Sequence, residues 1–306
     1  ANLHYIDGVM MAEKKIIAVI GATGAQGGGL AQAILSDPNS EFTVRAITRN
    51  TESVKAKALQ EMGAEVVAAD LDDQASLNKA FEGAYGAFCV TFYWEHMSPE
   101  TEKAHAAALA SAAKASGVEH VVWSTFEDTR DSVPLHDERM PTLMDSYKVP
   151  HFDAKAEAND FFTDHGVPTT FLLTSFYWDN FINFGMGPKK SEDGKWSITM
   201  PLGDRKMPGI AAEDIGKCVH SIFKRSSEFI GKTVGLSGQH LNGAEMAAAL
   251  TSIVGEPVQY NAVPADVFRS FGFPGADDMG NMFQFKHDFE DLYRGNRDVE
   301  FARELN

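Results

Sequence analysis

The stretch that decides the fold is Ile16-Ile17-Ala18-Val19-Ile20 followed by Gly21-Ala22-Thr23-Gly24-Ala25-Gln26-Gly27. The five apolar residues are too few for a helix and end at a glycine, so they predict a buried strand of a parallel sheet. The next seven residues place glycine at every third position. A strand, a glycine turn and a helix in succession are typical of dinucleotide sites, where backbone N–H groups and a helix N-terminus hold a pyrophosphate. A turn of small residues that only packs tightly is the alternative.

Short β-rich runs alternate with Ala-rich helical stretches from Lys14 to about Gly238. This alternation predicts βαβ units and one parallel sheet that is covered by helices on both faces. Because crossovers between parallel strands are right-handed, the predicted fold class is α/β, with a Rossmann-type doubly wound sheet. The expected strands and helices alternate over residues 16–20, 27–35, 42–48, 53–62, 65–69, 74–81, 86–91, 99–116, 121–124, 151–165 and 169–174.

The C-terminal part of the chain differs from the rest. Residues 181–208 are rich in Gly, Pro and Lys and predict loops with a short hairpin at 195–198. Helices are expected over 212–223 and 244–254, and a strand over 233–236. We therefore predict a Rossmann domain of residues 11–176 plus about 209–238, and a smaller α/β lobe of about 177–208 plus 239–306. Residues 1–10 are interpreted as a leader or a cloning remnant.

Composition and charge exclude several classes of protein. The 306 residues include 27 Lys and Arg against 43 Asp and Glu, a formal net charge of −16. Such a surface repels phosphate backbones and anionic lipid, so we expect no direct nucleic-acid partner and no membrane partner. Cys89 and Cys218 are isolated in apolar settings, and the histidines lack metal-ligand spacing, so neither a disulfide nor a metal is expected. A cytoplasmic location fits, with the nucleus as a second one.

The end of the second predicted strand, Thr48-Arg49-Asn50, is where the adenosine ribose of a dinucleotide would be bound. A carboxylate there favours NAD, whereas the guanidinium of Arg49 favours a 2′-phosphate and therefore NADP(H) as cofactor. An exposed surface arginine is the alternative. Asp70 and Leu71 end the third strand, where adenine is expected, although Asp72 and Asp73 could instead cap the next helix.

These features together resemble the NmrA-like family of atypical short-chain dehydrogenases. The resemblance runs from about Lys14 to Phe285, and it is greatest to the human NADPH sensor of that family. It is carried by residues 21–27, 48–50, 63–67, 90–95, 151–155, 214–216 and 272–276.

The resemblance implies roles for individual residues. It places Gly21, Thr23, Gly24, Ala25 and Gln26 around the pyrophosphate, Arg49, Asn50 and Ser53 around the 2′-phosphate, and Asp70, Leu71 and Gln74 beside adenine. It places Thr91, Phe92 and Tyr93 along the path to the nicotinamide, Lys155 on the nicotinamide ribose, and the segment from Tyr177 to Asn180 over the nicotinamide. This sequence departs from the family pattern at two positions, which puts two cofactor contacts in doubt. Ser53 stands where the human protein has a basic residue, and the lysine expected in the helix after the fourth strand is displaced by one position, to Lys103.

Reduction by hydride transfer needs a proton donor near the nicotinamide. Active short-chain dehydrogenases carry a tyrosine four residues before a lysine, and the corresponding pair here is His151 and Lys155. The tyrosine is therefore absent. Lys155 is the first candidate for a catalytic residue, and Ser124 could occupy the usual serine position. His151 could donate a proton, although a helix-start histidine that touches solvent is the favoured interpretation.

Two functions fit these residues. A complete dinucleotide motif beside an incomplete catalytic pair favours an NADP(H)-binding sensor whose conformation or assembly responds to the cofactor. A regulatory protein partner and a homodimer are the associations expected of it. The alternative is an NADPH-dependent reductase of a small carbonyl, quinone or enone, with its substrate between the two lobes. Met279, Met282, Phe283 and Phe285 have helical spacing and predict core packing.

Overall fold

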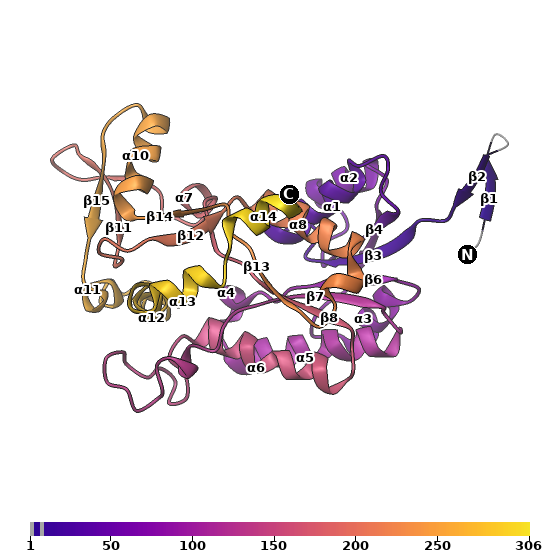
Figure 1. Ribbon diagram of the computed structural model, residues 1–306, viewed down its shortest axis with the longest axis horizontal. Helices are drawn as coiled ribbons and strands as arrows, with labels where there is room; N and C mark the ends of the chain where they lie inside the picture. Colours follow the sequence, from indigo (N-terminus) through magenta and orange to yellow (C-terminus); the bar gives the residue numbers. More distant parts are fainter. Residues whose placement is uncertain (1–2, 7–8) are drawn as a thin grey trace.

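A seven-stranded sheet forms the centre of the computed structural model, which describes residues 3–6 and 9–306 (Figure 1). Its strands lie in the order β13, β8, β7, β6, β3, β4, β5, and all neighbours are parallel. In chain order they are β3 (Lys15–Ile20), β4 (Phe42–Thr48), β5 (Glu65–Ala68), β6 (Gly86–Cys89), β7 (His120–Thr125), β8 (Thr169–Leu173) and β13 (Thr233–Gly235). The predicted α/β, Rossmann-type sheet is confirmed.

Helices cover both faces of this sheet (Figure 1). On one face α8 packs against α1 and α14, and on the other α5 packs between α3 and α6. Their bounds, with those of α2, are α1 (Ala25–Leu35), α2 (Val54–Glu61), α3 (Gln74–Phe81), α5 (Pro99–Ala115), α6 (Pro150–Asp164), α8 (Ala212–Lys224) and α14 (Val299–Leu305). The smaller elements beside them are α4 (Tyr93–His96), the 3₁₀ turn η1 (Thr129–Asp131) and α9 (Ser226–Phe229).

The apolar sequence of the strands explains this core. The last four residues of β3 and all six of β7 are buried, as expected of strands with a helix on each face. A close approach of α1 and α8 accounts for the glycines at positions 29 and 216. A Cβ atom on Gly216 of α8 would lie 2.1 Å from the carbonyl carbon of Gly29 in α1, so only glycine allows this contact.

A second lobe follows β8 and has its own apolar cluster, to which Met279, Met282, Phe283 and Phe285 contribute as predicted. It contains two small sheets, β14-β12-β9 and β10-β11-β15. Their strands are β9 (Phe176–Tyr177), β10 (Lys189–Lys190), β11 (Trp196–Met200), β12 (Met207–Ile210), β14 (Gln239–Leu241) and β15 (Val258–Ala262). Its helices are α7 (Asn180–Asn183), α10 (Gly243–Val254), α11 (Ala265–Arg269), α12 (Ala276–Asp288) and α13 (Glu290–Gly295).

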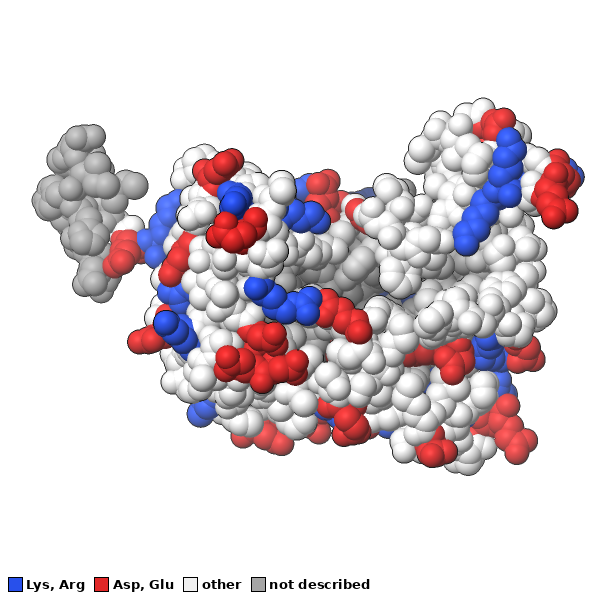
Figure 2. Space-filling model, turned by 180° about the vertical axis from the view of Figure 1, so that it is seen from behind, with Lys and Arg blue, Asp and Glu red and all other residues white. Residues whose placement is uncertain are grey.

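The two ends of the chain lie apart from this second lobe. β1 (Leu3–Ile6) and β2 (Val9–Ala12) form an antiparallel pair that projects from the body (Figure 1). At the other end, Ala302 and Leu305 of α14 join the apolar cluster of the main sheet, on the other side of the predicted boundary at residue 239. The domain bounds and the interpretation of residues 1–10 stay predictions. On the face in Figure 2, Lys and Arg are scattered among Asp and Glu.

Candidate active site

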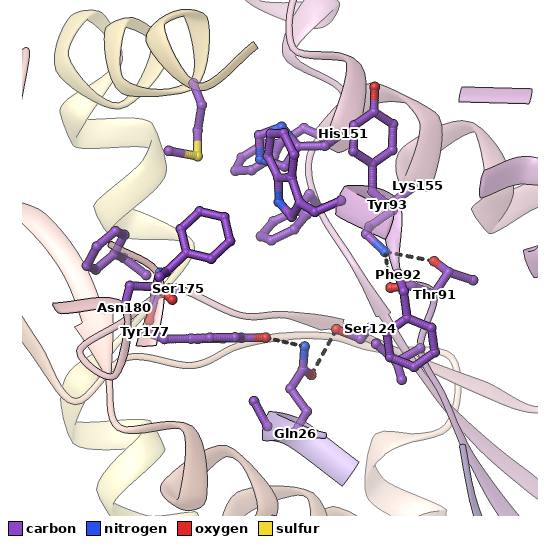
Figure 3. A pocket seen from close by; sticks show the side chains of 18 of the residues that line it. Gln26, Thr91, Phe92, Tyr93, Ser124, His151, Lys155, Ser175, Tyr177 and Asn180 are labelled. Atoms are coloured by element: carbon purple, nitrogen blue, oxygen red, sulfur yellow. Dashed lines mark hydrogen bonds between the residues drawn. The ribbon is translucent and has the colours of Figure 1, made fainter. Parts of the chain in front are cut away.

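A cavity of about 400 Å³ lies at the carboxyl ends of β3, β6 and β7 and just beyond β8 (Figure 3). β3 has β4 on one side and β6 on the other, so the order in which strands are added to the sheet reverses at this point. Open α/β sheets bind ligands at such a point. The second lobe closes the cavity through residues of β9, α7, α12 and α13. A cavity therefore lies at the predicted location of a site between the two lobes.

The glycine turn forms one wall of the cavity. Gly21 has a φ of +61°, and a Cβ on Gly27 would lie 2.4 Å from the carbonyl oxygen of Gly21. Helix α1 begins after Gly24, with no side chain capping this end and no acidic residue in the first turn. The N–H groups at the start of α1 are therefore available to an anion, and the turn fits a pyrophosphate.

The residues expected around the 2′-phosphate lie outside the cavity, beyond the end of β4. Arg49 Nη2 lies 2.9 Å from Glu95 Oε1, and both side chains are exposed. Ser53 caps α2 by accepting a hydrogen bond from Ala56 N, and Asn50 Oδ1 accepts one from Glu52 N. Sequence reasoning missed Lys55, whose Nζ is 3.5 Å from the carbonyl oxygen of Thr23 and adds a cation beside the glycine turn.

The residues expected beside adenine also lie outside the cavity. Asp70 Oδ1 accepts a hydrogen bond from Asp72 N, and Leu71 packs against the main apolar cluster. Gln74 Nε2 donates to the carbonyl oxygen of Ala108 at 3.0 Å, which turns this side chain toward α5. Asp73 caps α3, as its alternative interpretation predicted. These contacts leave the adenine prediction untested.

Lys155 is held in a buried polar network at the end of β6 (Figure 3). Its Nζ donates to Thr91 Oγ1 at 2.7 Å, to the Thr91 carbonyl oxygen at 3.2 Å and to Glu102 Oε1 at 2.5 Å. An ammonium has three donors, so these bonds use all of them. Glu102 is fully buried and was not predicted. Burial acts to raise the pKa of Glu102, but Lys155 and the Thr91 hydroxyl hold it below its ordinary value.

His151 corrects the sequence interpretation. It was expected to touch solvent, yet it is 5% exposed because the second lobe covers the start of α6. Its Nδ1 lies 2.6 Å from Asp278 Oδ1 of α12, and its backbone N–H donates to Asp278 Oδ2 at 3.1 Å. The ring packs against Trp94, with ring centroids 4.8 Å apart. His151 lines the cavity, so the structure supplies an oriented His–Asp pair where the family tyrosine is missing.

A chain of three side chains crosses the cavity below this pair (Figure 3). Gln26 Nε2 donates to the Tyr177 hydroxyl at 2.5 Å, and Gln26 Oε1 accepts from Ser124 Oγ at 3.0 Å. Burial raises the pKa of Tyr177 to about 12, so its hydroxyl stays protonated. Asn180, Phe92 and Tyr93 line the same cavity, and their contact with the nicotinamide stays a prediction.

Other classes of site find less support. Cys89 and Cys218 are both buried and free. Among the residues described here, no group of three or more His, Cys, Asp and Glu side chains could hold a metal ion. Within the same part of the chain, no helix is both long and apolar enough to cross a membrane.

The sheet, the glycine turn and the cavity at the switch point define a Rossmann-type α/β protein. The chain belongs to the NmrA-like family, whose sequence pattern matches residues 13–304. This confirms the predicted resemblance, while the similarity to the human NADPH sensor stays a prediction.

Three known proteins illustrate the relationship. The NmrA-like family domain-containing oxidoreductase FrzB of Cladobotryum sp is 29% identical over 293 residues, which cover 88% of this chain and 83% of FrzB. The negative transcriptional regulator NmrA in complex with NADP superposes with a TM-score of 0.74 at 23% identity, over 96% of this chain and 91% of NmrA. The triphenylmethane reductase of Citrobacter sp. complexed with NADP(H) gives 0.69 at 22% identity, over 90% of each chain. At these identities the two structures establish the shared fold.

Proposed function

We propose that this chain is an NADP(H)-dependent oxidoreductase that reduces a largely apolar substrate in the cavity. One observation carries the proposal: a single cavity extends from the glycine turn to His151, which is paired with the buried Asp278. FrzB is named an oxidoreductase, and both structural relatives above were solved with NADP or NADP(H). These names support the proposal without identifying a substrate.

The cofactor would lie across the carboxyl ends of the strands. Its pyrophosphate would meet the N–H groups at the start of α1, which neither a capping side chain nor a carboxylate occupies. Arg49 and Lys55 would provide positive charge for the 2′-phosphate, in competition with Glu95 for Arg49. Asp70, Leu71 and Gln74 remain our proposal for the adenine end. The nicotinamide end would enter the cavity beside Thr91, Phe92 and Tyr93.

The chemistry that a reduced nicotinamide would supply, when bound, is a hydride for an electron-poor carbon of the substrate. The electron pair of the C=O or C=C–C=O group then moves onto oxygen, which needs a proton. We assign its donation to His151, because an imidazole can give a proton at neutral pH and Asp278 fixes its ring orientation. Lys155 has its three donors engaged, so we assign it to positioning Thr91 at the ribose end of the cavity.

Oxidation of NADPH in the presence of a panel of quinones, enones and carbonyls tests this function. We expect turnover by the wild-type protein and a fall in kcat of about 100-fold in His151→Gln, which removes the proton donor. Affinity for NADPH, measured by calorimetry, should change little. His136→Gln is the matched control, because His136 is exposed and does not line the cavity.

Two results would count against the proposal. Undiminished turnover in His151→Gln would remove His151 from the mechanism. Absence of NADPH oxidation across the panel, in protein shown to bind NADPH, would argue against a reductase. Lys155→Ala completes the series, and we expect it to lower both affinity for NADPH and turnover through loss of the Thr91 contacts.

A sensor is the second candidate, and the Arg49–Glu95 ion pair favours it. Glu95 belongs to α4, which also contributes Tyr93 and Trp94 to the cavity. A 2′-phosphate that draws Arg49 away from Glu95 would release α4, and a regulatory partner or a second copy in a homodimer could respond to that change. Hydrogen exchange at residues 93–96 should then increase with NADPH but not with NADH. Equal exchange with both cofactors would contradict the sensor.

A further inference from the structure

Lys286 of α12 is a buried amine that the functions above do not use. It lines the cavity and is 3% exposed. Among the described residues, its hydrogen-bond partner is the thioether of Met207, with 3.8 Å between Nζ and Sδ. A thioether is a weak acceptor. Lys286 therefore holds a donor group inside the protein without an oxygen to receive it.

Aromatic rings surround this amine. The Nζ atom lies 5.2–5.9 Å from the ring centroids of Phe152, Phe176, Phe283 and Tyr293. Ring faces attract a cation, and they compensate in part for the water that Lys286 has lost. Phe152, Phe176 and Tyr293 also line the cavity. The amine thus lies at an apolar, aromatic end of the same space that begins at the glycine turn.

The charges around Lys286 do not neutralise it. Burial, which is the largest cause, and the charge of Arg297 lower the pKa of Lys286, Glu127 acts in the opposite direction, and the net result is a pKa of about 7. Glu127 is already engaged by Arg297, with 3.0 Å between Nη2 and Oε2. Two other charged pairs beside the cavity, His151 with Asp278 and Lys155 with Glu102, have their charged atoms 2.6 Å and 2.5 Å apart. An added anion would therefore find its complement at Lys286.

Unpartnered hydroxyls point to the same conclusion. Among the described residues, the buried hydroxyls of Tyr293 and Ser175 have no hydrogen-bond partner, and both residues line the cavity. Buried polar atoms are nearly always bonded in folded proteins, so these two hydroxyls are free to bond a ligand that carries polar atoms. The aromatic walls around them indicate that the rest of this ligand is apolar.

We propose that the cavity binds an aromatic carboxylate, whose oxygens accept hydrogen bonds from Lys286 Nζ and the Tyr293 hydroxyl while its rings pack among the aromatic walls. The single amine of Lys286 can neutralise one negative charge. A carboxylate carries one such charge, whereas a phosphate group would bring more negative charge into the apolar cavity than Lys286 can neutralise. This inference rests on the proposed function in one respect only, which is that the aromatic carboxylate is taken as the substrate class of the reductase. The binding site itself can be measured without any turnover.

Calorimetric titration of the full chain with 2-naphthoate and 2-naphthamide tests the site, because these probes share their rings and differ in charge. Near pH 6.5 we expect the wild type to bind the carboxylate at least about tenfold more tightly than the amide. Lys286→Met should lose this preference while it keeps the affinity for the amide. Lys224→Met is the matched control, because Lys224 pairs with Asp37 on the surface.

Two further measurements test the site even if Lys286→Met does not fold. Tyr293→Phe deletes a hydroxyl that has no partner, so it should fold normally and bind naphthoate about threefold or more weakly. In the wild type, affinity for naphthoate should fall as pH rises from 6.5 to 9, because the free amine loses its proton. Affinity for naphthamide should not change over this range.

Equal affinity of the wild type for both probes, or an unchanged preference in both Lys286→Met and Tyr293→Phe, would overturn the site. Failure to bind either probe would overturn it as well. Binding of NADPH and turnover with the quinone and carbonyl panel are measured separately on the same samples. If the protein prefers the carboxylate but shows no turnover, the reductase is contradicted and the carboxylate site is retained. If it shows turnover but no preference for the carboxylate, the carboxylate site is contradicted and the reductase is retained.

Discussion

Lys286 is a single residue that should make the stability of the protein depend on pH. Its pKa in the folded protein is lowered to about 7, whereas an unfolded lysine titrates near 10.5. Between pH 7 and pH 10.5 the Lys286 amine is protonated in the unfolded chain but largely neutral in the folded protein. The free-energy cost of burying this amine on folding therefore decreases as pH rises. Lys286→Met should therefore be more stable than the wild type near pH 6, and this advantage should narrow by about 2–3 kcal/mol by pH 9.

Urea denaturation of the two proteins at several pH values measures this difference. Lys224→Met should follow the wild type at each pH, since its amine lies at the surface beside Asp37. A constant stability difference between Lys286→Met and the wild type from pH 6 to pH 9 would show that the Lys286 amine keeps its proton in the folded state.

Sequence reasoning at the residue scale succeeded where partners are close in the chain. The glycine turn and the cap at Asp73 depend on neighbours within a few positions, and both were predicted. His151 was misjudged because the groups that bury it come from the second lobe, and Asp278 lies 127 positions away. Glu102 and Lys286 were missed because a charged residue on a helix is usually exposed, and nothing local marks an exception.

At the scale of elements, the turn from β3 into α1 should tolerate substitution at one glycine but not at its neighbour. A Cβ on Gly27 would lie 2.4 Å from the Gly21 oxygen and 2.7 Å from the Ile20 oxygen, both backbone atoms. Gly27→Ala should lower the free energy of unfolding by about 2–3 kcal/mol. It should also weaken NADPH binding, because the turn must shift.

Gly28→Ala is the control, one position further along α1. Its Cβ would meet the Ala22 oxygen at 3.3 Å, a contact that small adjustments can relieve. Alanine also favours the helix by up to about 1 kcal/mol over glycine, so stability should change by less than that amount. Thermal denaturation of both variants measures these changes in stability. An equal loss of stability in Gly27→Ala and Gly28→Ala would contradict the tight contact at Gly27.

Long elements were predicted from sequence more reliably than short ones. The strand Phe42–Thr48 and the helix Gln74–Phe81 have the predicted bounds, because each carries the apolar pattern of its type over several residues. The strands Phe176–Tyr177 and Gln239–Leu241 were not predicted. They are two and three residues long, and their pairing with β12 depends on contacts far apart in the chain.

At the scale of the whole molecule, the order of strands and helices was sufficient to predict a doubly wound sheet. Right-handed crossovers leave few alternatives once the alternation is known. The second lobe could not be built in the same way, because its two small sheets bring together segments as distant as residues 189 and 262. The cavity is formed by both lobes, so its location was predictable and its chemistry was not.

The molecule as a whole is proposed to work through NADP(H), and calorimetric titration with NADPH and with NADH tests this claim most directly. The account predicts one NADPH bound per chain, at least about tenfold more tightly than NADH, because we propose that Arg49 and Lys55 supply positive charge to the 2′-phosphate. Arg49→Gln should reduce that preference. No binding of NADPH, or equal affinity for the two cofactors, would contradict the account.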